Sequence, residues 1–201
     1  MKTLNGFKEF KFKEKGSVFI AQAYPVESVD EVAEILKKIK KKYYDATHHC
    51  FAYKLFSGEI KYSDDGEPNG SAGIRILNAI EHFGLENVLV IVIRYFGGTK
   101  LGVGPLGKAY YQAAAGSLKE ADITEKELYI KIKIQYDYEM TNKIHHLISK
   151  YHAKNIVNGF AGKPFIEFFV TAGSVDALVR EAIEITGGKI KTEVNNSPVL
   201  I

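Results

Sequence analysis

The chain alternates between β-branched apolar runs and segments in which apolar residues recur at helical spacing. Residues 17–26 (SVFIAQAYPV) and 87–96 (NVLVIVIRYF) are rich in Val and Ile, so we predict two strands, the second in the centre of a sheet. Ser28, with Glu31 three residues later, is the N-cap expected for a helix that continues to about residue 43. Residues 46–56 and 59–63 predict a hairpin, and 71–83 and the Ala-rich stretch after Pro105 predict two more helices. These elements describe a first domain over residues 1–124.

A second set of elements begins at Leu128. It has the order strand, helix, strand, strand, helix, strand, or βαββαβ, which is the ferredoxin-like plan. The polar and apolar alternation from residue 129 to 134 indicates that one face of this sheet is solvated. We therefore expect an α+β protein whose second domain spans residues 125–201, joined to the first by a short charged linker at 124–127.

Composition and charge narrow the class of protein. Hydrophobic residues make up 46% of the chain, with 12 Phe and 12 Tyr, which is typical of a folded globule. The formal net charge of +3 does not by itself indicate a nucleic-acid-binding protein. The single cysteine, Cys50, cannot form an internal disulfide, and the N-terminal segment has charges where a signal peptide needs an apolar core. No run approaches the roughly 20 apolar residues of a membrane span, so we expect a cytoplasmic protein.

The first of three unusual polar segments is YDATHHC, residues 44–50. Strand alternation directs His48 and Cys50 to one face and His49 to the other, so only part of this set can share a pocket. Cys50 with a neighbouring histidine and Asp45 is the one candidate for nucleophilic catalysis, although catalytic partners normally converge from separate elements. Adjacent His and Cys residues have poor spacing for a metal site, and we expect none, although the carboxylates of the next segment could complete one.

The second segment is SDDGEPNGSAG, residues 63–73, with three carboxylates within four residues. It is either a solvated turn or, with Asn69, Gly70 and Ser71, an anion-binding helix terminus. Together the first two segments give the candidate catalytic residues: Asp45, His48, Cys50, Asp64, Asp65 and Glu67.

The third segment, RYFGGTKLGVG, is the end of a strand, a glycine-rich turn and the start of a helix. Backbone N–H groups and cations arranged in this way can bind a phosphate or carboxylate, whereas the glycines can also serve only positive φ angles and close packing. The candidate anion- or nucleic-acid-binding residues are Arg94, Tyr95, Gly97, Gly98, Lys100, Gly102 and Lys108. The string Gly102-x-Gly104-x-x-Gly107 lacks the strand placement and the acidic residue of a dinucleotide site, so we expect no cofactor.

The strings YDATHHCFAY, YSDDGEPNGSAG and IRYFGGTKLGVGPLGKAY together resemble the YigZ/IMPACT family, over about residues 17–120. The resemblance implies an N-terminal α/β sandwich like the second domain of a small-subunit ribosomal protein, followed by a ferredoxin-like domain similar to the terminal domain of an elongation factor G. Eukaryotic relatives modulate translation through protein contacts, and the bacterial branch implies association with nucleic acid or the ribosome. The chain departs from the family at three positions: Arg75 replaces a usual proline, Pro105 a glycine, and Lys108 a common arginine.

Two functional hypotheses follow. In the first, the protein is a translation-linked regulatory binding protein that contacts RNA, the ribosome or a translation-associated protein. Arg94, Lys100 and Lys108 would then contact phosphates, and aromatic side chains near Tyr95 would stack on bases. In the second, it is a hydrolase-type enzyme that uses the Asp/His/Glu cluster on a small phosphorylated or acyl substrate. A pure protein-interaction adaptor is a third alternative. An open basic surface would favour RNA, and a pocket with His48 beside a carboxylate would favour the enzyme.

Overall fold

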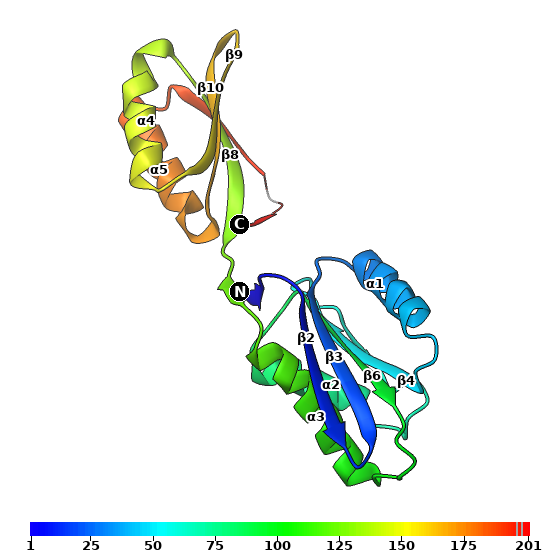
Figure 1. Ribbon diagram of the computed structural model, residues 1–201. Coiled ribbons are helices and arrows are strands. Elements are labelled where there is room, and N and C mark those ends of the chain that lie inside the picture. Colours follow the sequence, from blue (N-terminus) through cyan, green and yellow to red (C-terminus); the bar gives the residue numbers. More distant parts are fainter. Residues whose placement is uncertain (196, 198) are drawn as a thin grey trace. The chain divides into compact units, whose positions relative to one another are not determined.

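The computed structural model describes residues 1–195, 197 and 199–201, which form two compact units, Met1–Glu125 and Lys126–Ile201 (Figure 1). The first unit contains β1 (Lys2–Leu4), β2 (Lys8–Glu14), β3 (Ser17–Pro25), α1 (Val29–Lys42), β4 (His48–Lys54), β5 (Ile60–Ser63), α2 (Gly73–His82), β6 (Val88–Tyr95), α3 (Val103–Lys119) and β7 (Ile123–Glu125). In the described part of the chain, no helix combines the length and the apolar character needed to cross a lipid bilayer.

The first unit is a sheet covered on both faces by helices, as predicted for an α/β sandwich. The strand order is β2-β3-β6-β4-β5, with antiparallel neighbours throughout. β6 lies in the centre and is buried from Val88 to Arg94, which confirms the predicted central strand. α2 and α3 pack on one face and α1 on the other (Figure 1). Phe19 of β3 therefore faces α3, whereas its neighbour Ile20 faces α1.

The predicted start of α1 is confirmed. The Ser28 hydroxyl accepts a hydrogen bond from the Glu31 backbone N–H at 3.2 Å, which satisfies one of the free N–H groups of the first turn. The last turn carries Lys40, Lys41 and Lys42, where cations are favourable beside the negative end of the helix dipole.

The sequence analysis did not predict three strands of the first unit, β1, β2 and β7. β2 forms an edge strand against β3. Apolar and polar residues alternate along it, and Phe12 packs against the core, but the many lysines make this pattern difficult to recognise in the sequence. β1 and β7 pair with each other, with Thr3 opposite Thr124 and Lys2 opposite Glu125. The linker predicted for residues 124–127 was therefore wrong at its first two residues, because their partner strand lies more than a hundred positions away.

The second unit confirms the predicted βαββαβ order. It contains β8 (Leu128–Tyr136), α4 (Thr141–Lys150), β9 (Lys154–Ala161), β10 (Lys163–Thr171), α5 (Val175–Thr186), β11 (Ile190–Val194) and β12 (Val199–Leu200), with short 3₁₀ turns at Tyr138–Met140 and Ala172–Ser174. The strand order β11-β8-β10-β9, antiparallel throughout, is that of a ferredoxin-like sheet. α4 and α5 cover one face of this sheet, over Ile132, Ile134 and Phe168 (Figure 1).

Candidate functional site

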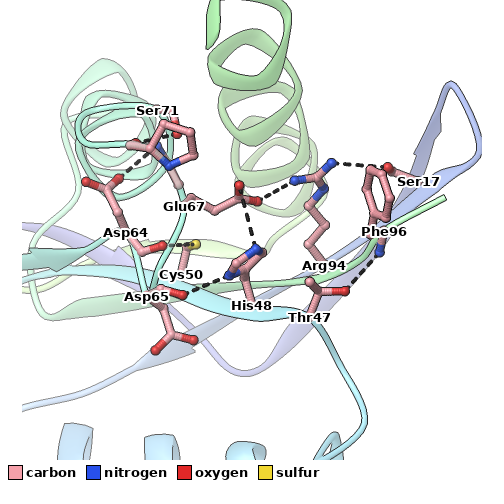
Figure 2. A network of polar contacts seen from close by, with 12 residues as sticks. Ser17, Thr47, His48, Cys50, Asp64, Asp65, Glu67, Ser71, Arg94 and Phe96 are labelled. Atoms are coloured by element: carbon pink, nitrogen blue, oxygen red, sulfur yellow. Dashed lines mark hydrogen bonds and ion pairs between the residues drawn. The ribbon is translucent and has the colours of Figure 1, made fainter. Parts of the chain in front are cut away.

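The three polar segments meet at one face of the first sheet (Figure 2). His48 on β4 lies directly opposite Arg94 on β6, so both side chains point to the same face. The loop after β5 crosses above them and brings the Glu67 side chain and the carbonyl oxygens of Asp64 and Asp65 into the same cluster. α3 completes the cluster with Tyr110, which sequence analysis missed because a tyrosine in an Ala-rich helix resembles a core residue.

A buried ion pair lies at the centre of this cluster. Arg94 Nη1 donates to Glu67 Oε1 at 2.6 Å, and the two side chains are only 6% and 4% exposed. The Tyr110 hydroxyl donates to the same carboxylate oxygen at 2.7 Å, and Arg94 Nη2 donates to the Ser17 hydroxyl at 3.3 Å. The guanidinium carbon lies 5.5 Å from the ring centroids of Phe19 and Phe96. The pair therefore joins β3, β6, the loop after β5 and α3.

Burial corrects the role predicted for Arg94. As an RNA-phosphate contact it would have to be exposed, but its charge is already neutralised by Glu67. Tyr95, the neighbouring candidate, donates its hydroxyl hydrogen to Asp45 at 2.9 Å. Gly97 contacts the turn between β2 and β3, where its N–H donates to the Ser17 hydroxyl at 3.2 Å. These contacts tie the start of the glycine-rich turn to the domain.

The candidate nucleophile Cys50 lies in the interior of the first unit. Its side chain is fully buried, with Sγ 3.0 Å from the Asp64 carbonyl oxygen and 3.3 Å from the Tyr110 hydroxyl. Burial, together with the charges of Glu67, Asp65 and Asp64, raises the pKa of the thiol to about 12 despite the hydrogen bond to Tyr110, so the thiol is neutral at physiological pH. Burial, followed by contact with Cys50 and Glu67, also raises the pKa of Tyr110.

The histidines follow the predicted alternation. His48 Nδ1 lies 2.8 Å from the Asp65 carbonyl oxygen, which fixes the ring, and Nε2 lies 3.7 Å from Glu67 Oε2, beyond hydrogen-bond distance. His49 points the other way and places Nε2 3.0 Å from the Tyr43 carbonyl oxygen. A hydrogen bond between His48 and a carboxylate would have favoured the enzyme hypothesis, and the 3.7 Å between His48 and Glu67 does not provide one.

The Asp64 side chain lies at the N-terminus of α2, where the sequence also allowed binding of an external anion. One carboxylate oxygen accepts from the N–H groups of Ala72 at 2.9 Å and Gly73 at 2.8 Å, and the other accepts from Gly70 at 2.9 Å. Asp65 is held by the His49 N–H at 2.7 Å and by Lys40 at 3.1 Å. Of the two alternatives for residues 69–71, the anion-binding terminus is disfavoured, because Asp64 already supplies a negative charge there.

Asp64→Asn should remove a pH-dependent part of the stability. Burial opposes ionisation of Asp64, but the three N–H donors outweigh it, so its pKa is lowered. Such a carboxylate stabilises the fold above its unfolded pKa of about 3.9, and this stabilisation is lost as the pH falls through the lower folded pKa. We expect the variant to lose about 1–3 kcal/mol at neutral pH, with the gap to wild type closing at acid pH.

Urea denaturation across a pH series measures this difference, with the exposed Asp30→Asn as the matched control. The control should lose less stability than Asp64→Asn at neutral pH, because Asp30 is exposed and, among the residues that the structure describes, interacts only with the dipole of α1. An Asp64→Asn deficit of the same size at neutral and acid pH would contradict the proposed role of the charge.

The candidate carboxylates do not assemble into a metal centre. Within residues 1–195, 197 and 199–201, no group of three or more His, Cys, Asp or Glu side chains converges as metal ligands would. Asp45 accepts a hydrogen bond from the Tyr95 hydroxyl and lies exposed in the loop between α1 and β4.

An open basic surface lies beside this cluster, over the start of α3. One hollow of about 350 Å³ is lined by Arg75, Asn78, Gly104, Gly107, Lys108 and Tyr111, and a second of about 430 Å³ by Glu14, Lys15, Gly104, Pro105, Lys108, Ala109 and Gln112. The two share Gly104 and Lys108, so they form one continuous surface, which we call the basic cleft. Of its residues, sequence analysis singled out only Lys108 for binding and noted Arg75 as an added cation.

The cations of the basic cleft are available to a ligand. None of Lys15, Arg75 and Lys108 forms an ion pair with any described residue. Arg75 lies against Gly107, where a Cβ would come within 3.2 Å of Nε, and donates Nε–H to the Gly70 carbonyl at 3.2 Å. α3 begins with neither an acidic residue in its first turn nor a side-chain cap, so its positive end is not neutralised locally.

Comparison with known proteins gives matches over most of the chain. Residues 15–118 match the family model described as the Impact N-terminal domain. The chain is 32% identical over 177 residues to the IMPACT family member YvyE of Bacillus subtilis, covering 86% of this chain and 81% of that relative. It is 25% identical over 181 residues to the IMPACT family member YigZ of Escherichia coli, covering 88% and 89%. A solved structure described as "Crystal structure of an hypothetical protein" shares the fold, with a TM-score of 0.68 at 22% identity over 98% of each chain.

Proposed function

The chain belongs to the IMPACT family, and from this premise we propose that it is a translation-linked regulatory binding protein that contacts RNA through the basic cleft. The observation that carries the proposal is the group of three cations without ion-pair partners around the start of α3. The link to translation rests on the family resemblance, and the choice of RNA rests on the chemistry of this surface.

The chemistry of the cleft suits a phosphate backbone. Lys15, Arg75 and Lys108 come from the β2–β3 turn, α2 and α3, and Glu14 is the one carboxylate among all the residues that line either hollow. The positive end of α3 adds to their field. Cations spread over a shallow surface can follow successive phosphates of a polymer, whereas a small substrate is usually enclosed by a deeper pocket.

The contacts of the acidic residues support binding over hydrolysis. Asp64 holds the start of α2, Asp65 holds β4, and Glu67 neutralises Arg94. Each carboxylate already has partners within the domain, and Cys50 is protonated and buried. A general acid or base needs a proton-transfer partner on the substrate, whereas these carboxylates are engaged by groups of the domain itself.

Arg75→Ala/Lys108→Ala should weaken RNA binding and reduce its salt dependence. Loss of two phosphate contacts lowers the slope of log affinity against log salt by about 2. We expect at least a roughly tenfold loss of affinity for ribosomal RNA at low salt, measured by sedimentation and fluorescence anisotropy over a salt series.

The matched control is Lys37→Ala/Lys41→Ala, which removes the same charge from exposed positions of α1, on the opposite face of the sheet. It should leave the slope nearly unchanged. Equal losses in both double variants would show that net charge, and not the basic cleft, controls binding, and absence of binding at low salt would refute the proposal.

A further inference from the structure

The second unit presents a sheet face that none of its helices covers. α4 and α5 pack on the other face, and the uncovered side is drawn without a helix in Figure 1. The register places seven side chains of β8, β9 and β10 together on this side, which we call the open sheet face: Tyr129, Lys131, Lys133, Lys154, Phe165, Glu167 and Phe169. Glu167 lies opposite Lys133, and Phe169 lies opposite both Lys131 and Lys154.

Aromatic rings occupy the middle of the open sheet face. Phe165 and Phe169 project from β10 and are partly exposed. The Phe165 ring lies over Gly159 of β9, so close that a Cβ there would be 2.2 Å from Cζ. Glycine at this position therefore leaves room for the ring to lie across the sheet, in the orientation a stacking surface needs.

Two lysines lie over aromatic rings of this face, one over Phe165 and one over the buried Tyr129. Lys133 Nζ lies 4.3 Å from the Phe165 ring centroid, and Lys154 Nζ lies 4.4 Å from that of Tyr129. Such contacts keep the ammonium groups beside aromatic surface while their other sides remain in water.

The charge of the open sheet face is positive. Glu167 is shared by Lys131 at 2.6 Å and Lys133 at 3.6 Å, and Lys154 has no ion-pair partner among the described residues. On β8, β9 and β10, three lysines thus face one carboxylate, and on β11 Glu193, opposite Lys133, is paired with Lys191 at 3.2 Å. The Lys131 and Lys133 side chains are 43% and 34% exposed, so their pairs with Glu167 are weak enough to exchange for phosphate.

We propose that the open sheet face binds single-stranded RNA, with bases stacked on Phe165 and Phe169 and phosphates contacted by Lys131, Lys133 and Lys154. The inference rests on the proposed function for its ligand class, RNA, but it uses another surface and different chemistry. Stacking requires unpaired bases, whereas the basic cleft needs only phosphates. The positive charge favours a polyanion over an apolar protein surface.

The test compares two fluorescent ligands of equal length, an oligouridine and its abasic counterpart. Phe165→Leu/Phe169→Leu keeps the apolar bulk but removes both stacking surfaces. We expect at least a roughly tenfold loss of oligouridine affinity and no change for the abasic strand. Phe160→Leu is the matched control, because Phe160 is 73% exposed on the same hairpin but points to the other face, opposite Pro164.

The outcomes separate this inference from the proposed function. If the leucine variant binds oligouridine like wild type while Arg75→Ala/Lys108→Ala loses it, the open sheet face is refuted and the basic cleft stands. If only the leucine variant loses binding, the inference stands and the basic cleft is refuted. Equal loss for the abasic strand would refute stacking, and a wild-type dimer that the leucine substitutions dissociate would show that a second copy of the chain occupies this face.

Discussion

Glu67→Ala is expected to lower the free energy of unfolding of the first unit by about 3–5 kcal/mol. The substitution leaves the Arg94 guanidinium 6% exposed and without its carboxylate. Arg94 Nε already lacks a hydrogen-bond partner, the one such buried side-chain atom in the part of the chain that the structure describes. The variant also removes the acceptor of the Tyr110 hydroxyl, so two buried polar groups lose their partner at once.

Urea denaturation measures the effect, and hydrogen exchange of the β6 amides reports the first unit separately from the second. The control is Glu34→Ala, which breaks the exposed Glu34–Lys38 pair of 3.9 Å and should change stability by less than about 0.5 kcal/mol. The double variant Glu67→Leu/Arg94→Met should recover much of the loss, because apolar side chains do not require a charged partner. A loss in Glu67→Ala no larger than in Glu34→Ala would contradict the buried-pair account.

Gly97→Ala is expected to destabilise the first unit by about 1–3 kcal/mol or more. A Cβ at this position would lie 1.9 Å from the Gly16 carbonyl carbon and 2.2 Å from the Ser17 nitrogen. These are backbone atoms of the β2–β3 turn, which cannot rotate away as a side chain can. The glycine-rich turn would have to move from this position, and the hydrogen bond from Gly97 N–H to the Ser17 hydroxyl would be lost.

Gly104→Ala is the control in the same segment, because a Cβ there meets nothing within 4 Å. It should be neutral or slightly stabilising, since alanine favours a helix more than glycine does. Thermal denaturation with hydrogen exchange of β2 and β3 amides compares the two variants. Equal stability of Gly97→Ala and wild type would show that the close approach of the two turns is not required.

Gly97 was a candidate for anion binding in the sequence, but the structure gives it a packing role. The glycine-rich turn was singled out for anion binding, with close packing as the alternative, and at Gly97 close packing is what the structure shows. Gly98 and Gly102 have φ angles of +86° and +81°, which other residues rarely adopt. Sequence cannot separate these roles, since each requires the same absence of a side chain.

The basic cleft was only partly predictable. Lys108 was identified as a cation near the glycine-rich turn, and Arg75 as an added charge, but nothing along the chain places Lys15 beside them. That neighbour depends on the pairing of β2 with β3, an element hidden by its lysines. Arg94 was chosen for the same role and is buried, because its partner Glu67 lies 27 residues away on another loop.

The sequence by itself determined the elements of this protein: the central strand β6, the start of α1 at Ser28 and the βαββαβ order of the second unit. Periodicity and helix capping act over a few residues, so the local pattern is sufficient. Only the tertiary structure decided which charged groups face water. Arg94 and Glu67 neutralise each other in the interior, whereas Lys15, Arg75 and Lys108 remain on the surface, because ion pairing and burial depend on contacts between segments far apart in the chain.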